Sequence, residues 1–247
     1  MRVLVTGAAG YIGRVVARDL AANHQVRGFD IRPMPDLGDA VVADLDHQDD
    51  IDRALDGVGA IAHLAWPTGE LRGPPSERRD LGLGARATYQ LLQSAVERGV
   101  ERFVFQSTLN VTYPSWDDWR ITEEELARPG VGSYALGKTL AEEACRSFAR
   151  AHPIDIAVFR VGGVFTLEET GHEAASPEQH YVPSSCVERR DIAQAYHLAL
   201  TRPLPSRFEI FHLFHDRPGE RFSIEKAKRV LGFIPRYNCE QLWRQKP

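Results

Sequence analysis

The sequence predicts an α/β protein built on a doubly wound parallel sheet. Two observations carry this prediction. Short β-rich runs alternate with helix-length segments as far as Leu200, and a glycine-rich turn follows the first of these runs. A chain of 247 residues is long enough to bury one large core, so we expect a single domain over residues 1–247.

The expected strands are short and rich in β-branched and aromatic residues, and the expected helices are longer and mixed in polarity. The strands are Val3–Thr6, Gln25–Asp30, Ala40–Ala43, Ala60–His63, Arg102–Ser107 and Ile154–Arg160. The helices are Tyr11–Ala22, Asp49–Leu55, Glu77–Arg98, Ser133–Ala151 and Arg190–Thr201. A last strand, Phe208–Leu213, and a helix over Ser223–Leu231 complete the fold as a small C-terminal portion.

Three long segments are predicted to be loops: Trp66–Ser76, Thr108–Gly132 and Val164–Cys186. In doubly wound folds, ligands bind beyond the carboxyl ends of the strands, where long loops can build a pocket. We therefore expect the substrate-binding elements mainly in residues 164–186 and 203–247.

Composition excludes several classes of partner. A formal charge of −4 and a pI near 6.1 give no attraction to nucleic acid or to an acidic membrane. No apolar run approaches the ~20 residues that cross a bilayer, and the chain enters a strand at once, without a leader peptide. Three widely spaced cysteines suit a reducing cytoplasm, and the nine histidines form no metal-ligand spacing. We expect a cytoplasmic protein without a metal.

The glycine-rich turn that follows the first strand, Thr6 to Gly13, is suited to a dinucleotide pyrophosphate. Gly7 permits the tight turn, Gly10 lets the backbone approach phosphate, and Gly13 lets the following helix pack on the strand. The helix that begins near Tyr11 directs its free N–H groups and positive dipole end toward the same place. A glycine turn without a ligand is the simpler alternative for such a motif alone.

An acidic residue at the end of the second strand strengthens the dinucleotide hypothesis. Asp30 lies where a carboxylate can accept hydrogen bonds from the adenosine ribose and repel a 2′-phosphate. NAD is therefore favoured over NADP, although Arg32 stands two residues on and could accommodate that phosphate. Asp44 could place a carboxylate near the adenine, with a loop or helix-capping role as the alternative.

Tyr134 and Lys138 indicate the chemistry. They are four residues apart in an expected helix, so both side chains lie on one face. A free tyrosine has a pKa of about 10 and is a poor base at neutral pH, but a neighbouring ammonium favours the phenolate. Ser107 and Thr108 end the fifth strand, where a hydroxyl can hold a substrate oxygen beside the tyrosine. Without the other motifs, the simpler interpretation of Tyr134 and Lys138 is a pair of residues on the helix surface.

Taken together, the motifs resemble the extended short-chain dehydrogenase/reductase superfamily, in its NAD-dependent epimerase/dehydratase family, over nearly the whole chain. The segments that carry the resemblance are Thr6–Gly13, Asp30, Asp44-Leu45, His63-Leu64-Ala65, Ser107-Thr108, Tyr134–Lys138, Arg160–Gly163 and Val187–Ala193 with Asp191. The resemblance implies a Rossmann-type fold, Thr108 as the hydroxyl partner, Tyr134 as acid/base and Lys138 as its activator. It implies that NAD contacts Gly7, Ala9, Gly10, Tyr11, Ile12, Gly13, Asp30, Arg32, Asp44, Leu45, Leu64, Ala65, Tyr134 and Lys138.

The chain departs from the family pattern at three places. Gly84 and Gly163 stand where many relatives carry asparagine, which puts the roles of those asparagines in doubt here. Leu109 and Asn110 follow Thr108, where sugar-nucleotide dehydratases carry an Asp-Glu pair. Without an acid at that step, dehydration is disfavoured.

The length and the opening motif resemble uronate dehydrogenases and related small sugar dehydrogenases. The resulting hypothesis is an NAD-dependent oxidoreductase acting on a secondary hydroxyl or carbonyl of a small sugar or sugar acid. The expected substrate contacts are Trp66, Ser107, Asn110 and Arg160, with a structural ion pair as the alternative for Arg160. Packing under a loop is the alternative for Trp66, and for Trp116 and Trp119, which also lie in the expected pocket loops. His172 and His180 lie in the last of these loops and are assigned no role beyond polar contacts. An epimerase that retains its cofactor is the second hypothesis, and a non-catalytic dinucleotide-binding protein is the third.

The resemblance also predicts a homodimer, in which two long helices pair between subunits: Glu77–Arg98 and Ser133–Ala151.

Overall fold

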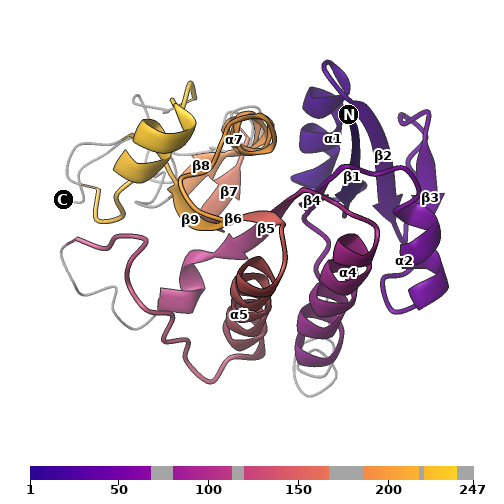
Figure 1. Ribbon diagram of the computed structural model, residues 1–247. Helices are drawn as coiled ribbons and strands as arrows, with labels where there is room; N and C mark the ends of the chain where they lie inside the picture. The colour runs from indigo at the N-terminus through magenta and orange to yellow at the C-terminus, as the bar shows by residue number, and fades with distance from the viewer. Residues whose placement is uncertain (68–79, 113–119, 167–185, 217–219, 238–247) are drawn as a thin grey trace, which may run out of the picture.

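The fold is a parallel sheet of seven strands in the order β3-β2-β1-β4-β5-β6-β9 (Figure 1). The computed structural model describes residues 1–67, 80–112, 120–166, 186–216 and 220–237. The strands are β1 (Arg2–Thr6), β2 (Gln25–Asp30), β3 (Ala40–Val42), β4 (Ala60–His63), β5 (Arg102–Thr108), β6 (Asp155–Val161) and β9 (Phe208–Leu213). This order reverses between β1 and β4, which confirms the doubly wound, Rossmann-like sheet.

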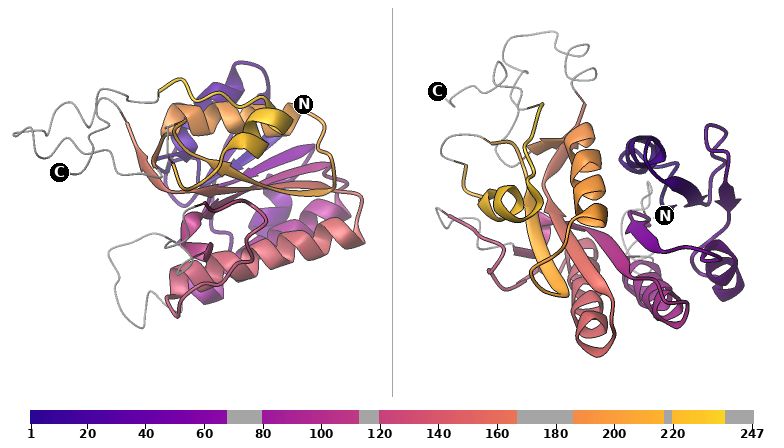
Figure 2. Two further views of the ribbon diagram at one scale, coloured as in Figure 1. Left: turned by 90° about the vertical axis from the view of Figure 1, so that its left-hand side faces the viewer. Right: turned by 45° about the horizontal axis from the view of Figure 1, so that its top comes forward.

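Helices cover both faces of the sheet (Figure 2). Helices α1 (Gly13–Ala21) and α7 (Arg189–Thr201) pack against each other on one face. Helices α2 (Gln48–Ala54), α4 (Arg86–Glu97) and α5 (Ser133–Ala151) line the other face. Each face buries its own apolar cluster, centred on Phe159 and Tyr196 on the α7 side and on Phe103 and Leu91 on the α4 side. Burial on both faces explains why the central strands are almost continuously apolar.

Two helices differ from the sequence expectation in their internal geometry. The expected helix Glu77–Arg98 is a π-helical turn, η1 (Asp80–Ala85), followed by α4. The expected helix Ser223–Leu231 contains the π-helical turn η4 (Ala227–Leu231). Periodicity predicts that a segment is helical but does not distinguish π from α hydrogen bonding, and π turns are frequent at functional sites.

The expected loop Val164–Cys186 is wrong at both of its ends. Residues Gly163–Phe165 form strand β7 and Cys186–Glu188 form strand β8, and the two pair in parallel as a separate small sheet. Strands of three residues carry too little pattern to be recognised, because their pairing depends on contacts distant in sequence. A short 3-10 turn, η2 (Leu109–Thr112), follows β5.

The C-terminal portion is fixed to the main body by Asp191 on α7. Its two carboxylate oxygens accept the backbone N–H groups of Arg236 at 2.8 Å and Tyr237 at 3.1 Å. Burial raises the pKa of this carboxyl to about 6, against the opposing effect of those two N–H donors. Asp191 thus holds residues 236 and 237 against α7. In the described part of the chain, no helix has the length and apolar character required to cross a bilayer.

Candidate active site

The three glycines of the turn after β1, Gly7, Gly10 and Gly13, have no space for a side chain. Gly7 adopts φ +71, and its N–H donates to the carbonyl of Phe29 at 2.8 Å. A Cβ on Gly7 would lie 2.7 Å from the backbone nitrogen of Ala65, and one on Gly10 would lie 2.9 Å from the Gly7 carbonyl oxygen. A Cβ on Gly13 would overlap that same oxygen. The turn therefore presents bare backbone, as close approach of a pyrophosphate requires.

Helix α1 begins directly behind this turn. Its N-cap residue is Ile12, which offers no side-chain oxygen to cap the first turn. The positive end of the helix dipole is thus directed at the turn without a competing carboxylate, since the first turn of α1 contains no acidic residue.

Asp30 joins the turn to the end of β2. Its carboxylate accepts the N–H of Ala9 at 3.0 Å and the N–H of Arg32 at 3.0 Å, and Nε of Arg32 lies 3.4 Å away. Its side chain is only 7% exposed, whereas that of Arg32 is 60% exposed. A carboxylate offers about four acceptor positions, so Asp30 retains capacity for a ribose hydroxyl while it holds the turn.

A cavity of about 440 Å³ opens along these residues at the carboxyl end of the sheet. Its wall contains nearly all of the expected cofactor contacts: Gly7, Gly10, Tyr11, Ile12, Gly13, Asp30, Arg32, Asp44, Leu45, Leu64 and Ala65. Ala9 is placed by its hydrogen bond to Asp30 instead. The glycine cradle, the helix end and the acid fit a dinucleotide, and the volume is in the usual range for a ligand site.

Trp66 and Gln106 also line this cavity, whereas Thr108, Tyr134 and Lys138 are not among its lining residues. Nζ of Lys138 donates to the carbonyl oxygen of Gln106 at 2.5 Å and lies 3.9 Å from the centre of the Trp66 ring. The Tyr134 ring meets the Trp66 ring edge-on at 6.2 Å. Lys138 is 2% exposed and Tyr134 is 39% exposed. The lysine is thus held in place while the tyrosine remains accessible to a substrate.

The hydroxyl residues at the end of β5 are directed to different places. Thr108 is the last residue of the strand, and its Oγ1 accepts the N–H of Asn110 at 3.3 Å. Asn110 itself is exposed on η2. Ser107 is buried, and its Oγ donates to Glu142 at 2.5 Å. Its hydroxyl is therefore engaged with Glu142 on α5, and a contact between Ser107 and the substrate stays a prediction.

Arg160 follows the alternative of a structural ion pair. Its guanidinium donates to both carboxylate oxygens of Glu142, at 3.1 Å from Nε and 2.8 Å from Nη2, and Nη1 donates to the carbonyl of Glu125. Both side chains of the pair are 1% exposed. The structure thus shows the ion pair that was the alternative for Arg160, and a substrate contact by this residue stays a prediction.

Two contributors to the site were not predicted from the sequence. Gln106 supplies the carbonyl for Lys138, and Glu142 binds Ser107 and Arg160. Gly84, noted above as a departure from the family pattern, lies against Trp66. Glu142 follows Lys138 by one helical turn, so the extended spacing Tyr-x-x-x-Lys-x-x-x-Glu was its available signal. A backbone carbonyl such as that of Gln106 leaves no sequence signal. Trp116, Trp119, His172 and His180 lie outside the described residues.

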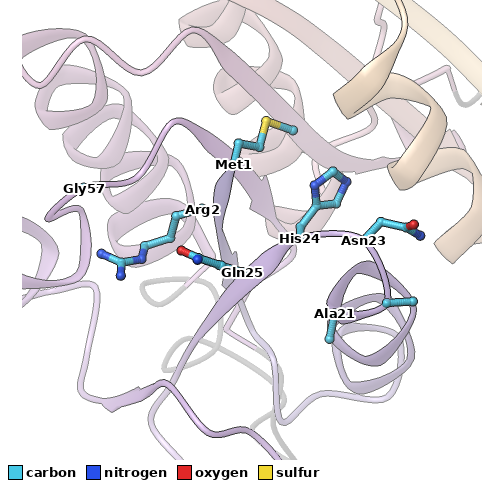
Figure 3. Close-up of a pocket in the computed structure, with 8 residues that line it drawn as sticks. Met1, Arg2, Ala21, Asn23, His24, Gln25 and Gly57 are labelled. Carbon is cyan, nitrogen blue, oxygen red and sulfur yellow. The ribbon is translucent and has the colours of Figure 1, made fainter.

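A second hollow, of about 510 Å³, opens at the opposite end of the sheet (Figure 3). It lies at the amino ends of β1 and β2, where doubly wound sheets do not bind their ligands. Arg2 donates from Nη1 to the carbonyl of Asp56, and the His24 ring faces His197 at 5.6 Å. In Figure 3 the Arg2 and Gln25 side chains extend to one side of the strands, whereas Asn23 points to the opposite side. Across the described ranges, no cluster of three or more His, Cys, Asp or Glu side chains is arranged to hold a metal ion.

The fold and the site together define a dinucleotide-dependent oxidoreductase of the short-chain type. A model of the NAD dependent epimerase/dehydratase family matches residues 3–179. The chain belongs to this family of NAD-dependent enzymes.

Relatives with assigned activities are similar over different lengths. An L-arabinose 1-dehydrogenase (NAD(P)(+)) from Haloferax volcanii is 26% identical over 96% of this chain and 97% of that enzyme. A uronate dehydrogenase from Pseudomonas syringae is 30% identical over 66% of this chain and 60% of that enzyme. Among solved structures, a short-chain dehydrogenase/reductase superfamily protein from Agrobacterium tumefaciens with bound NAD superimposes with a TM-score of 0.85. It is 23% identical and is matched over 98% of this chain and 94% of its own.

Proposed function

We propose that the protein is an NAD-dependent dehydrogenase that transfers hydride between nicotinamide and a secondary hydroxyl or carbonyl of a small sugar or sugar acid. One observation carries the proposal: Trp66 and Gln106 line the same cavity as the glycine turn, both contact Lys138, and Trp66 also contacts Tyr134. Cofactor cradle and acid/base pair thus belong to one continuous site.

Tyr134 is proposed as the group that moves the proton. In the direction of oxidation its phenolate accepts the proton of the substrate hydroxyl, and its 39% exposure leaves it accessible for this contact. The ammonium of Lys138, on the same helix face, favours that phenolate electrostatically. Thr108, at the end of β5, donates its hydroxyl to the substrate oxygen and orients it. Bound nicotinamide supplies the hydride acceptor or donor.

NAD is proposed as the preferred dinucleotide. Asp30 places a carboxylate at the end of β2, where it would accept ribose hydroxyls and repel a 2′-phosphate. The contact between Nε of Arg32 and Asp30, at 3.4 Å, supports this preference, because it engages the guanidinium that could otherwise receive that phosphate.

A free sugar or sugar acid is proposed as the substrate. The similarity to an arabinose dehydrogenase and a uronate dehydrogenase supports this class. Leu109 follows Thr108 where a dehydratase would need an acid, so the chemistry stops at hydride and proton transfer. Asn110, exposed directly beyond Thr108, and Trp66 are the proposed contacts for the remaining part of the sugar.

The test is NADH absorbance with NAD and a panel of free sugars, sugar acids and secondary alcohols. Substrate-dependent NADH should fall by about 100-fold or more in Tyr134→Phe, because general acid–base catalysis contributes that much. Tyr89→Phe removes a phenol from exposed α4 instead and should keep full activity. NAD binding without NADH formation on any of these substrates would contradict the proposal.

An epimerase is the second candidate, because the matching family model includes epimerases. Such an enzyme oxidises and re-reduces its substrate without releasing NADH. Tightly retained cofactor in the purified protein, with isomer conversion and no net NADH, would favour it. A dinucleotide-binding protein without turnover is disfavoured, because both Tyr134 and Lys138 are present.

A cytoplasmic homodimer is the proposed state of the protein. Tyr89 on α4 and Leu140 on α5 are 51% and 49% exposed, so these neighbouring helices carry apolar side chains suited to a subunit interface. The free thiols of Cys145 and Cys186 support a reducing compartment. A monomer mass in light scattering at micromolar concentration would exclude the dimer.

A further inference from the structure

Trp66 occupies the space that any side chain at position 84 would need. A Cβ built on Gly84 would lie 2.6 to 2.9 Å from three atoms of the Trp66 indole. Gly84 belongs to the π-helical turn η1, which brings its backbone against this ring. The indole Nε1 is buried and has no hydrogen-bond partner among the described residues. Packing, and not a hydrogen bond, therefore sets the position of Trp66.

The indole face is in turn covered by the ammonium of Lys138. Nζ lies 3.9 Å from the centre of the Trp66 ring and 4.8 Å from that of Phe105, and it donates to the Gln106 carbonyl. A lysine that is 2% exposed has lost most of its hydration. An aromatic face at this distance compensates for part of that loss. The Tyr134 ring is edge-on to the Trp66 ring, with 6.2 Å between the ring centres.

We propose that Trp66, seated on Gly84, is a positioning residue for the acid/base pair: its π face holds the Lys138 ammonium beside Tyr134. The inference rests on the proposed function in that it assigns the acid/base role to Tyr134. It extends that proposal to the tryptophan, whose expected role was substrate contact, and to the glycine that makes room for it.

Three other titratable groups among the described residues lie near Lys138: His63, Cys145 and Glu142. Burial and the Lys138 charge lower the pKa of His63 on β4 to about 3. Burial raises the pKa of the Cys145 thiol on α5 well above its usual value. Glu142, one turn beyond Lys138, is paired with Arg160. The position of the Lys138 ammonium should therefore control the ionisation of Tyr134. Displacement of the ammonium should make the Tyr134 phenolate harder to form.

The experiment is an ultraviolet titration of tyrosinate without substrate, with the Tyr134 signal isolated by subtracting the same variant carrying Tyr134→Phe. Trp66→Leu keeps an apolar side chain but removes the π face, and it should move the Tyr134 midpoint upward by about one pH unit. Trp66→Phe keeps a π face and should remain within a few tenths of a pH unit of the wild type. Neither measurement requires turnover, so a failure here is distinct from a failure to find a substrate.

Gly84→Ala tests the same contact from the other side. Its methyl group should displace the indole and raise the Tyr134 midpoint in the wild-type background, but add nothing in Trp66→Leu. Thermal unfolding of each variant establishes that it folds, and Gly84→Ala still provides the answer if Trp66→Leu does not fold. An unchanged midpoint in Trp66→Leu, or equal displacement in the Phe and Leu variants, would overturn the inference, because filling of space would then be the whole role of Trp66.

Discussion

Glu142 and Arg160 form an ion pair in which each side chain is only 1% exposed, with 2.8 Å between Oε2 of the glutamate and Nη2 of the arginine. The pair connects α5 to β6, and the hydroxyl of Ser107 on β5 donates to the same carboxylate. The network thus fixes the helix that carries Tyr134 and Lys138 against the strand that ends in Thr108. Buried charges that are paired in this way are costly to separate.

Glu142→Leu should therefore destabilise the protein by about 3–5 kcal/mol, because it leaves the Arg160 charge buried and unpaired. The double variant Glu142→Leu with Arg160→Met should recover most of the loss, since two apolar side chains of similar volume replace the pair. Urea unfolding of the single and double variants measures both effects. A double variant no more stable than Glu142→Leu alone would show that the pairing is not the source of the cost.

Cofactor choice should depend on Asp30 and Arg32 jointly. Asp30→Asn keeps an acceptor for the Ala9 N–H but removes the charge, so the affinity for NAD should fall by about tenfold, the value of a hydrogen bond to a charged group. The affinity for NADP should rise, because Arg32 is released from the carboxylate. Titration calorimetry with both dinucleotides measures the ratio. Adding Arg32→Ala should abolish the gain for NADP, and a gain that persists would exclude the arginine as its cause.

Much of the fold could be predicted from the sequence because the strands of a doubly wound sheet are continuous apolar runs separated by helices. The turn from Gly7 to Gly13 and the acid at Asp30 were predictable for the same reason: each is a local motif whose residue types follow from backbone geometry. The partner of Arg160 was not predictable, since the sequence does not reveal that Glu142 lies within hydrogen-bond distance of it. The small sheet of β7 and β8 was missed because its pairing depends on tertiary contacts.

The small sheet explains a departure of this chain from its family pattern. A Cβ on Gly163 would lie 2.8 Å from Sγ of Cys186, the residue paired with it in register between β7 and β8. The thiol fills the space that any side chain at position 163 would need. Burial and the nearby Glu220 carboxylate raise the pKa of this thiol to about 11, so it acts as packing and not as a nucleophile.

Gly163→Asn should cost about 1–3 kcal/mol of stability, the usual penalty of overpacking. Cys186→Ala should relieve part of this cost in the double variant, because the sulfur that the new side chain meets is gone. Thermal unfolding of the two single variants and the double variant measures the coupling free energy between positions 163 and 186. Additive losses would show that the asparagine is excluded by something other than the thiol.

Stability at acid pH should depend on His63. Its ring is 1% exposed and lies between two threonine hydroxyls, with Nδ1 2.7 Å from Oγ1 of Thr6 and Nε2 3.0 Å from Oγ1 of Thr88. Burial, and then the positive charge of Lys138, lower the pKa from 6.5 to about 3. The folded chain thus keeps this ring neutral over a range in which the unfolded chain takes up a proton.

The sign of the effect follows from that difference in bound protons. Above pH 6.5 neither state protonates His63, so its contribution is complete there, and it is lost as the pH falls from 6.5 toward 3. In that window His63 should lower the free energy of unfolding by about 1.4 kcal/mol for each pH unit that the pH falls.

His63→Gln keeps polar atoms for the two threonines but cannot titrate, so its unfolding free energy should fall less steeply with acid. Urea unfolding at a series of pH values measures the slopes, with His47→Gln, at an exposed histidine, as the matched control. Equal slopes for wild type and His63→Gln would mean that the folded protein protonates this ring as readily as the unfolded chain does.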